Sequence, residues 1–118
     1  MRTAVIPKEL CPIEFVRAVD DTLDFIRGKW KLHILAALMN GGSKRFSELE
    51  RTIPNINPRM LSKELRDLEL NAMVKRTVYD TIPATVEYEI TGYGRSLDKL
   101  LLEMRDWGIQ HRKKITGK

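Results

Sequence analysis

The chain contains few of the residues that build disulfides and metal sites. It has one cysteine, Cys11, and two histidines, His33 and His111, among 118 residues. One cysteine excludes a disulfide within the chain and a cysteine-rich zinc site. Two histidines and one distant cysteine do not make a metal cluster, so we expect the histidines to be core or interface residues. We therefore expect no metal and no other cofactor.

Long apolar runs are also absent from the sequence. No segment approaches the roughly 20 apolar residues that span a bilayer, and the start of the chain, MRTAVIPKELCP, lacks the apolar stretch of a signal peptide. There is no glycine-rich phosphate loop and no convincing pair of nucleophile and base. We expect a cytoplasmic protein that does not contact a membrane and is not an enzyme.

The composition and length of the chain indicate one basic domain. The chain is 42% hydrophobic and 31% charged, enough for a core, and its length suits a single domain over 1–118. The formal net charge is +5. Excess positive charge favours polyanionic partners, nucleic acid ahead of anionic membranes, although many domains carry a few extra lysines.

Periodicity and capping residues predict three helices in the first half. Apolar residues recur every three or four positions over 12–27, and 30–39 is apolar enough for a largely buried helix. Ser47 and Glu50 match a capping box, so a short third helix should begin there.

The residue pattern in the second half of the sequence predicts a helix, a β-hairpin and a last helix. The fourth helix begins at Asn57-Pro58 and runs to about residue 70, and 73–80 and 86–90 read as the two strands of a hairpin. The fold class is therefore mainly α with a small antiparallel β-hairpin, a winged helix-turn-helix. Its parts are an N-terminal arm (1–11), the helix-turn-helix (about 44–70), the wing (about 73–90) and a last helix (about 94–113).

Charges separate on the fourth predicted helix, within NINPRMLSKELRDLE (55–69). A helix advances about 100° per residue, so residues of different kinds fall on different faces. The leucines Leu61, Leu65 and Leu68 share one face, Arg59, Ser62, Lys63 and Arg66 lie nearly opposite, and Glu64, Asp67 and Glu69 fall on the flanks.

A basic outer face attracts phosphate, and arginine can also fork onto a guanine edge in the major groove. The free N–H groups after Asn57 can bind a phosphate as well. The alternative is a solvated amphipathic helix whose charges only pair locally.

The last helix carries more apolar surface than a domain of this size hides easily. We expect extra N- and C-terminal helices to form a symmetric homodimer, the alternative being that the whole stripe is intramolecular core. The predicted interface comprises Phe15, Val19, Leu97, Leu100, Leu101, Met104, Trp107 and His111.

Two stretches, 28–76 and VEYEITGYGRSL (86–97), resemble the HxlR-type transcriptional regulators, winged-helix proteins similar in fold to the MarR group. The resemblance covers about 11–109. It implies a cytoplasmic homodimer that binds a pseudo-palindromic operator in double-stranded DNA. Its motifs are Cys11-Pro12, Gly28-Lys29-Trp30, Arg45-Phe46-Ser47-Glu48-Leu49, the leucine-bearing helix, Tyr88 with Thr91, Gly94, and Trp107-Gly108.

The order of elements and the resemblance together assign DNA contacts. The half-sites should lie about one helical turn apart, roughly 34 Å. The rival interpretation is a winged helix that binds proteins and has lost DNA. The predicted contacts are Lys44, Arg45 and Ser47 to phosphate, Asn57, Arg59, Ser62, Lys63 and Arg66 in or near the major groove, and Lys75 and Arg76 on the hairpin.

Two positions depart from the family pattern. Ala72 stands where the family usually has glycine, and we expect Asn71 to supply the left-handed residue instead. The wing has no arginine near Thr85, which argues against insertion of a wing arginine into the minor groove.

Cys11 precedes a predicted helix, where a thiolate is stabilised. In the HxlR group some members use a cysteine at this position to sense oxidants or electrophiles, so Cys11 is a candidate sensor and a small-molecule or oxidant effector is expected. The alternatives are an inert or buried thiol and, from another class, a thiol enzyme.

Overall fold

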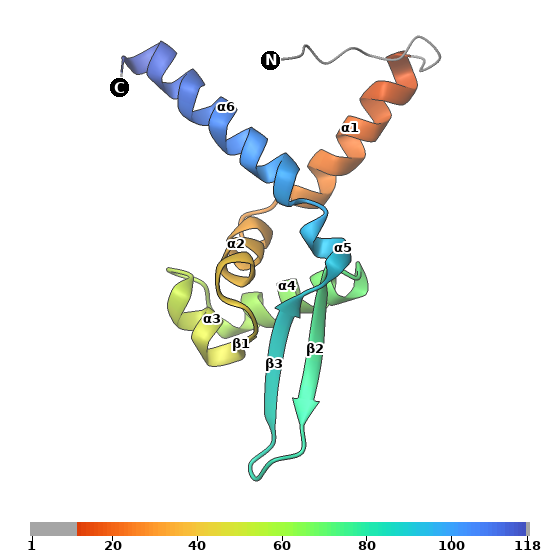
Figure 1. Ribbon diagram of the computed structural model, residues 1–118, viewed down its shortest axis with the longest axis vertical. Helices are drawn as coiled ribbons and strands as arrows, with labels where there is room; N and C mark the ends of the chain where they lie inside the picture. The colour runs from red at the N-terminus through yellow and green to blue at the C-terminus, as the bar shows by residue number, and fades with distance from the viewer. Residues whose placement is uncertain (1–11, 118) are drawn as a thin grey trace.

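The computed structural model describes residues 12–117, which form six helices and three strands. The elements follow the order expected for a winged helix-turn-helix, with one helix added at each end (Figure 1). They are α1 (Pro12–Ile26), α2 (Lys31–Gly41), β1 (Lys44–Arg45), α3 (Phe46–Thr52), α4 (Pro58–Leu70), β2 (Val74–Tyr79), β3 (Thr85–Ile90), α5 (Gly92–Arg95) and α6 (Asp98–Thr116).

The core lies where α2, α3 and α4 meet the base of the sheet. The predicted leucine face of α4 is confirmed, because Leu61, Leu65 and Leu68 are at most 1% exposed. Each such side chain contributes about 1.5–3 kcal/mol by leaving water. Ile34, Leu35 and Leu38 of α2, Leu49 of α3, and Met73, Val74 and Ile90 at the base of the sheet complete the core.

The helix α2 is buried on one face only, so the prediction of a largely buried helix was too broad. Leu32, His33 and Ala36 are exposed, because the core covers only the side of α2 that faces α3 and α4. His33 is exposed and is therefore not a core histidine, and its ring lies 5.8 Å from that of Trp30.

The sheet has three strands instead of the predicted two. β3 lies in the centre of the order β1-β3-β2, and both of its pairings are antiparallel. The pairing Lys44↔Tyr88 joins the turn before α3 to the wing, which we define as the β2–β3 hairpin. A two-residue strand is too short to show an alternating pattern, so the sequence did not reveal β1.

The third helix starts earlier than the capping box Ser47–Glu50 predicted. It begins at Phe46, and the backbone N–H of Arg45 donates to Oε1 of Glu48 at 2.8 Å. The earlier start brings Phe46 against the core, one turn before the fully buried Leu49. The packing of Phe46 against the core therefore makes Arg45 the N-cap residue of α3 in place of the predicted Ser47.

The fourth helix begins as predicted. The side chain of Asn57 accepts from the backbone N–H of Met60 at 2.8 Å, and Pro58 occupies the first turn, where its missing N–H costs nothing.

The end of α4 differs from the prediction, because Ala72 and not Asn71 is left-handed, with φ of 62° against −87°. The N–H of Met73 donates to the carbonyl of Leu68 at 2.9 Å, and that of Ala72 to Glu69 at 3.0 Å. These two bonds form a Schellman motif, in which the residue before Met73 must be left-handed. Burial of Met73 thus places an alanine in a conformation that costs about 1 kcal/mol.

The predicted last helix is broken into α5 and α6. Thr91 caps α5 by accepting from the N–H of Gly94 at 2.9 Å, and its hydroxyl donates to the carbonyl of Ala72 at 2.7 Å. Gly94 is so close to the sheet that a Cβ would lie 2.4 Å from the carbonyl oxygen of Met73. These contacts hold α5 against the end of α4, and the chain must turn before α6 begins.

The helices α1 and α6, which we call the arms, diverge at the end of the molecule opposite the wing (Figure 1). Among described residues, α6 buries none fully and α1 buries only Ile26. Within 12–117, no helix combines the length and hydropathy needed to cross a membrane.

Candidate nucleic-acid interface

The outward face of α4 is basic. Arg59, Ser62, Lys63 and Arg66 are all exposed, on the side of the helix opposite the buried leucines. The separation of leucines from bases that the sequence predicted is therefore present.

Two of the three acidic residues of α4 contact one lysine of α2. The Nζ atom of Lys31 lies 2.6 Å from Oε1 of Glu64 and 3.7 Å from Oδ2 of Asp67. The side chains of Lys31 and Glu64 are only 17% and 11% exposed. Glu64 thus faces the core and not the flank of the helix, because Lys31 reaches it from the neighbouring helix.

The bases of α4 keep their charge unpaired within the protein. None of Arg59, Lys63 and Arg66 makes an ion pair with another residue in 12–117. Local pairing along the helix, the alternative interpretation of this charge pattern, is therefore not what the structure contains. Three cations on one exposed face are left to attract anions from outside.

Two polar hollows follow this face of α4. One, of about 360 Å³, runs along the helix, and the other, of about 340 Å³, lies between the helix and the wing. Ser62 and Arg66 line both, so the two hollows are neighbours. The first is also lined by Arg59, Lys63 and Asp67, and the second by Leu65, Glu69, Arg76 and Tyr88.

A family model for the HxlR-like helix-turn-helix matches residues 25–116. The chain belongs to this family. The relatives are transcriptional regulators and not enzymes, and the chain is accordingly a helix-turn-helix regulator that binds DNA.

The HxlR-like chain is similar to several known regulators. It is 47% identical over 105 residues to the uncharacterized HTH-type transcriptional regulator YybR of Bacillus subtilis (strain 168), covering 89% of this chain and 78% of that protein. The structure of the HTH-type transcriptional regulator YtcD is 46% identical with a TM-score of 0.75, covering 80% and 96% of the two chains. The redox regulator HypR in its reduced form is 44% identical with a TM-score of 0.74, covering 86% and 99%.

The wing brings only one of its two bases beside α4. Arg76 pairs with Tyr88 across the sheet and Lys75 with Glu89, and successive strand residues point to opposite faces. Arg76 and Tyr88 therefore line the hollow beside α4, whereas Lys75 does not. Sequence reasoning missed Tyr88 as a site residue, although its register opposite Arg76 in a hairpin was the signal that could have found it.

The remaining predicted phosphate contacts lie outside both hollows. Lys44 is half-buried in β1, and its ammonium group packs against Gly41 at the end of α2. Arg45 and Ser47 are exposed at the start of α3. The wing tip carries no base, and its Ile82 is completely exposed.

The predicted dimer residues divide between the arms and the core. Leu97 packs against the core, and Phe15 and Leu101 are half-buried. Val19, Leu100, Met104, Trp107 and His111 are exposed, and the Trp107 and His111 rings stack with centroids 4.7 Å apart. Sequence reasoning missed further exposed apolar residues on the arms, namely Ile13, Val16, Leu23, Leu102, Ile109 and Ile115. Cys11 lies outside the described residues.

Replacing Lys31 by methionine should destabilise the fold. Glu64 would stay buried without a partner, and removing one member of a buried pair costs about 3 kcal/mol. Urea unfolding at fixed protein concentration would measure the loss. Arg27→Met is the matched control, because it breaks the exposed pair with Asp24 and should cost less than about 1 kcal/mol. Equal effects of the two substitutions would contradict the role given to Lys31.

Proposed function

We propose that the protein acts as a homodimer that binds a pseudo-palindromic operator, with α4 of each copy in the major groove. The observation that carries this proposal is the charge arrangement on α4. Its bases Arg59, Lys63 and Arg66 make no ion pair within 12–117, whereas Glu64 is buried against Lys31, away from the exposed face. This arrangement favours a polyanion along the helix.

Within this proposal, the residues of α4 divide by position. The first turn has free backbone N–H groups after Asn57, which suit a phosphate oxygen. Arg59, Ser62 and Lys63 reach the groove, where arginine can recognise guanine. Arg66 lies beside the wing, and with Arg76 it suits a phosphate at the edge of the groove. Lys44, Arg45, Ser47 and Lys75 remain proposed phosphate contacts at the border.

The exposed arms support the homodimer. Trp107 is 67% exposed and Ile13 is 71% exposed, and both belong to apolar stripes that nothing in the described chain covers. Exposed stripes of this length mark an interface, and a two-fold arrangement covers the same stripe on both copies. Two-fold symmetry would place the two α4 helices at half-sites about 34 Å apart.

DNA binding by α4 can be tested by salt titration. Fluorescence anisotropy with duplexes from the promoter region flanking the gene should show affinity that falls steeply with salt. The double substitution Arg59→Ala with Lys63→Ala should weaken binding tenfold or more and make the salt slope shallower by about two units, since each phosphate contact contributes about 0.9.

The matched control for this test removes two charges elsewhere. Lys113→Ala with Lys114→Ala lies at the far end of α6 and should change affinity by less than about threefold, because charges beyond about 10 Å are screened. Absent or salt-insensitive binding to every duplex would favour the rival function, a winged helix that binds proteins.

The dimer can be tested by placing a charge in the arm stripe. Sedimentation should give the parent protein a mass twice the 13.7 kDa of one chain. Trp107→Glu should weaken association by about 100-fold, because buried tryptophans are among the strongest contacts of an interface. Val78→Glu alters an equally apolar exposed residue on the wing and should leave the mass unchanged. A monomeric parent would contradict the proposal.

We also propose that oxidants act through Cys11, as expected of a relative of a redox regulator. Because the chain has no other cysteine, Cys11→Ser removes every thiol. Diamide should release the parent from operator DNA and leave the substituted protein bound. A Cys11→Ser protein that responds as the parent does would rule out the sensor.

A further inference from the structure

The wing extends away from the body of the molecule and ends in an exposed apolar tip (Figure 1). We define the tip as the loop 80–84 that joins β2 to β3. Its Ile82 is completely exposed, and among the described residues no other large apolar side chain is exposed so fully. The surroundings of Ile82 on the wing show what such a side chain can contact.

The wing separates charge between its two faces, as α4 does. Successive strand residues point to opposite faces, and residues paired across two strands share a face. The register therefore places both acids of the strands, Glu87 and Glu89, on the face that carries Lys75. Ser43 donates to Oε1 of Glu87 at 2.9 Å. The other face of the wing, which lines the hollow beside α4, has no acidic residue in either strand.

The face of the wing beside α4 changes from basic to apolar toward the tip. Arg76 pairs with Tyr88 next to α4, and Val78 pairs with Val86 one step farther out. Val78 is 53% exposed although it touches no other element of the fold that would require an apolar residue there. On this face, apolar surface thus runs from Arg76 to the loop that carries Ile82.

The tip has no positive charge. Between Arg76 and Glu87 the only charged residue is Asp80. Phosphate attracts cations and repels a carboxylate, so the tip is not suited to bind the sugar–phosphate backbone by charge. Contact of the tip with DNA therefore depends on apolar packing against sugars and bases inside a groove.

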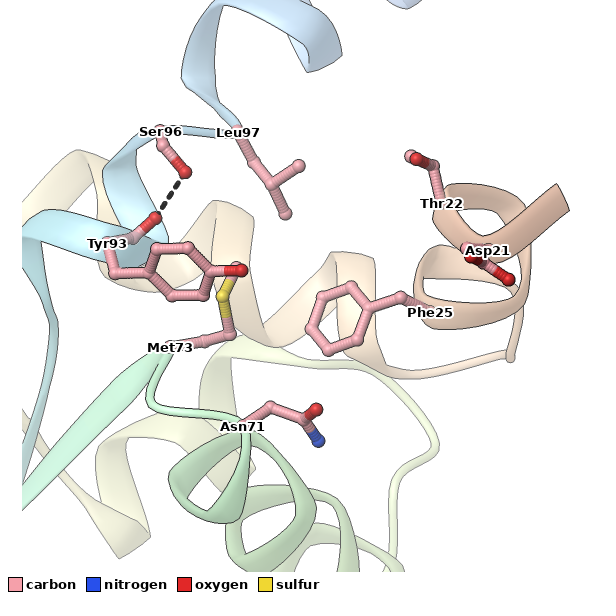
Figure 2. Close-up of a pocket in the computed structure, with 8 residues that line it drawn as sticks. All are labelled: Asp21, Thr22, Phe25, Asn71, Met73, Tyr93, Ser96 and Leu97. Atoms are coloured by element: carbon pink, nitrogen blue, oxygen red, sulfur yellow. Dashed lines mark hydrogen bonds between the residues drawn. The ribbon is translucent and has the colours of Figure 1, made fainter. Parts of the chain in front are cut away.

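The base of the wing is anchored in the core. Figure 2, a view into the pocket beside this anchor, shows the side chain of Met73 between the rings of Phe25 and Tyr93. Met73 precedes β2 and is 3% exposed, and its carbonyl accepts from the N–H of Thr91 after β3 at 2.9 Å. Both ends of the hairpin are thus attached to the domain that carries α4.

One threonine closes the loop at the tip. The backbone N–H of Thr81 donates to the carbonyl of Tyr79 at 2.9 Å, and its hydroxyl donates to the carbonyl of Pro83 at 2.7 Å. The same hydroxyl lies 3.4 Å from that of Thr85 across the loop. The loop therefore presents Ile82 in an ordered form, and a preorganised side chain loses little conformational entropy on binding.

The length of β2 suits the spacing of the grooves of DNA. A strand rises about 3.4 Å per residue, so Tyr79 at the end of β2 lies about 10 Å beyond Arg76, and the loop extends farther. About half a helical turn, roughly 17 Å, separates a major groove from the next minor groove. With α4 in the major groove and Arg76 at the phosphate on its edge, the tip lies over the neighbouring minor groove.

We propose that the tip enters this minor groove and inserts Ile82 as an apolar wedge at one base step, which opens the step and bends the DNA. The wedge rests on the proposed function, since α4 has to place the wing. Isoleucine and proline are among the residues that act as wedges in minor grooves. Pyrimidine–purine steps unstack most easily, so the wedge gives the wing a sequence preference without an arginine.

The fluorescence of 2-aminopurine reports the opened step, because it rises when the base is unstacked. In the promoter duplex that the parent protein binds, adenines are replaced by 2-aminopurine one at a time. With the parent we expect a rise of about threefold or more at one step in each half-site. Ile82→Ala should abolish this rise, and Ile82→Met, which keeps a residue of the wedge type, should retain it.

Anisotropy with the same duplex measures what the wedge adds to affinity. Ile82→Ala should weaken binding about tenfold through lost apolar contact, with an unchanged salt slope because no phosphate contact is lost. Tyr79→Ala is the matched control. It removes a larger side chain from the face of the wing away from α4 and should change affinity less than about threefold. Both side chains are exposed, so neither substitution should affect folding.

Exchange of the opened step tests whether Ile82 recognises it. Replacing a TA step by AA should cost the parent about fivefold in affinity and Ile82→Ala less than about twofold. Equal losses in the two proteins would overturn the wedge and leave the proposed function intact. So would full affinity and unstacking by Ile82→Ala, the result expected of a tip that binds a protein. Binding of the parent to no duplex would refute the proposed function and the wedge with it.

Discussion

The contact between Lys31 and Glu64 of α4 is the constraint on which the exposed basic face of that helix depends. At 2.6 Å from Glu64, Lys31 holds one negative charge of α4 away from its outward face, and at 3.7 Å it also contacts Asp67. A partly buried pair of this kind contributes little net stability, because both groups lose water. Its consequence is orientation, because the contact favours the arrangement of α4 with its leucines inward, Glu64 toward α2 and its bases outward.

A second region joins three parts of the fold. The left-handed Ala72, the carbonyl of Met73 and the cap formed by Thr91 meet at one point, where Gly94 allows close approach. The end of α4, the base of the wing and the turn before α6 are all attached there.

The arms α1 and α6 leave most of their apolar side chains exposed in a single chain. Their apolar side chains include Trp107, which stacks on His111 but remains 67% exposed. By contrast, the residues between α2 and β3 form a closed core. The contrast separates a closed core from two helices whose apolar side chains are largely exposed.

Local signals in the sequence determined the fold class, the start of α4 and the division of that helix into leucine and basic faces. These features depend on residues within a turn or two of one another, such as Asn57 with Met60 or Leu61 with Leu65 and Leu68. Only the tertiary structure decided the burial of Glu64, the placing of Arg76 and Tyr88 beside Arg66, the strand β1 and the conformation of Ala72. Each of these depends on a contact with a distant segment, and such contacts leave no periodic pattern in the chain.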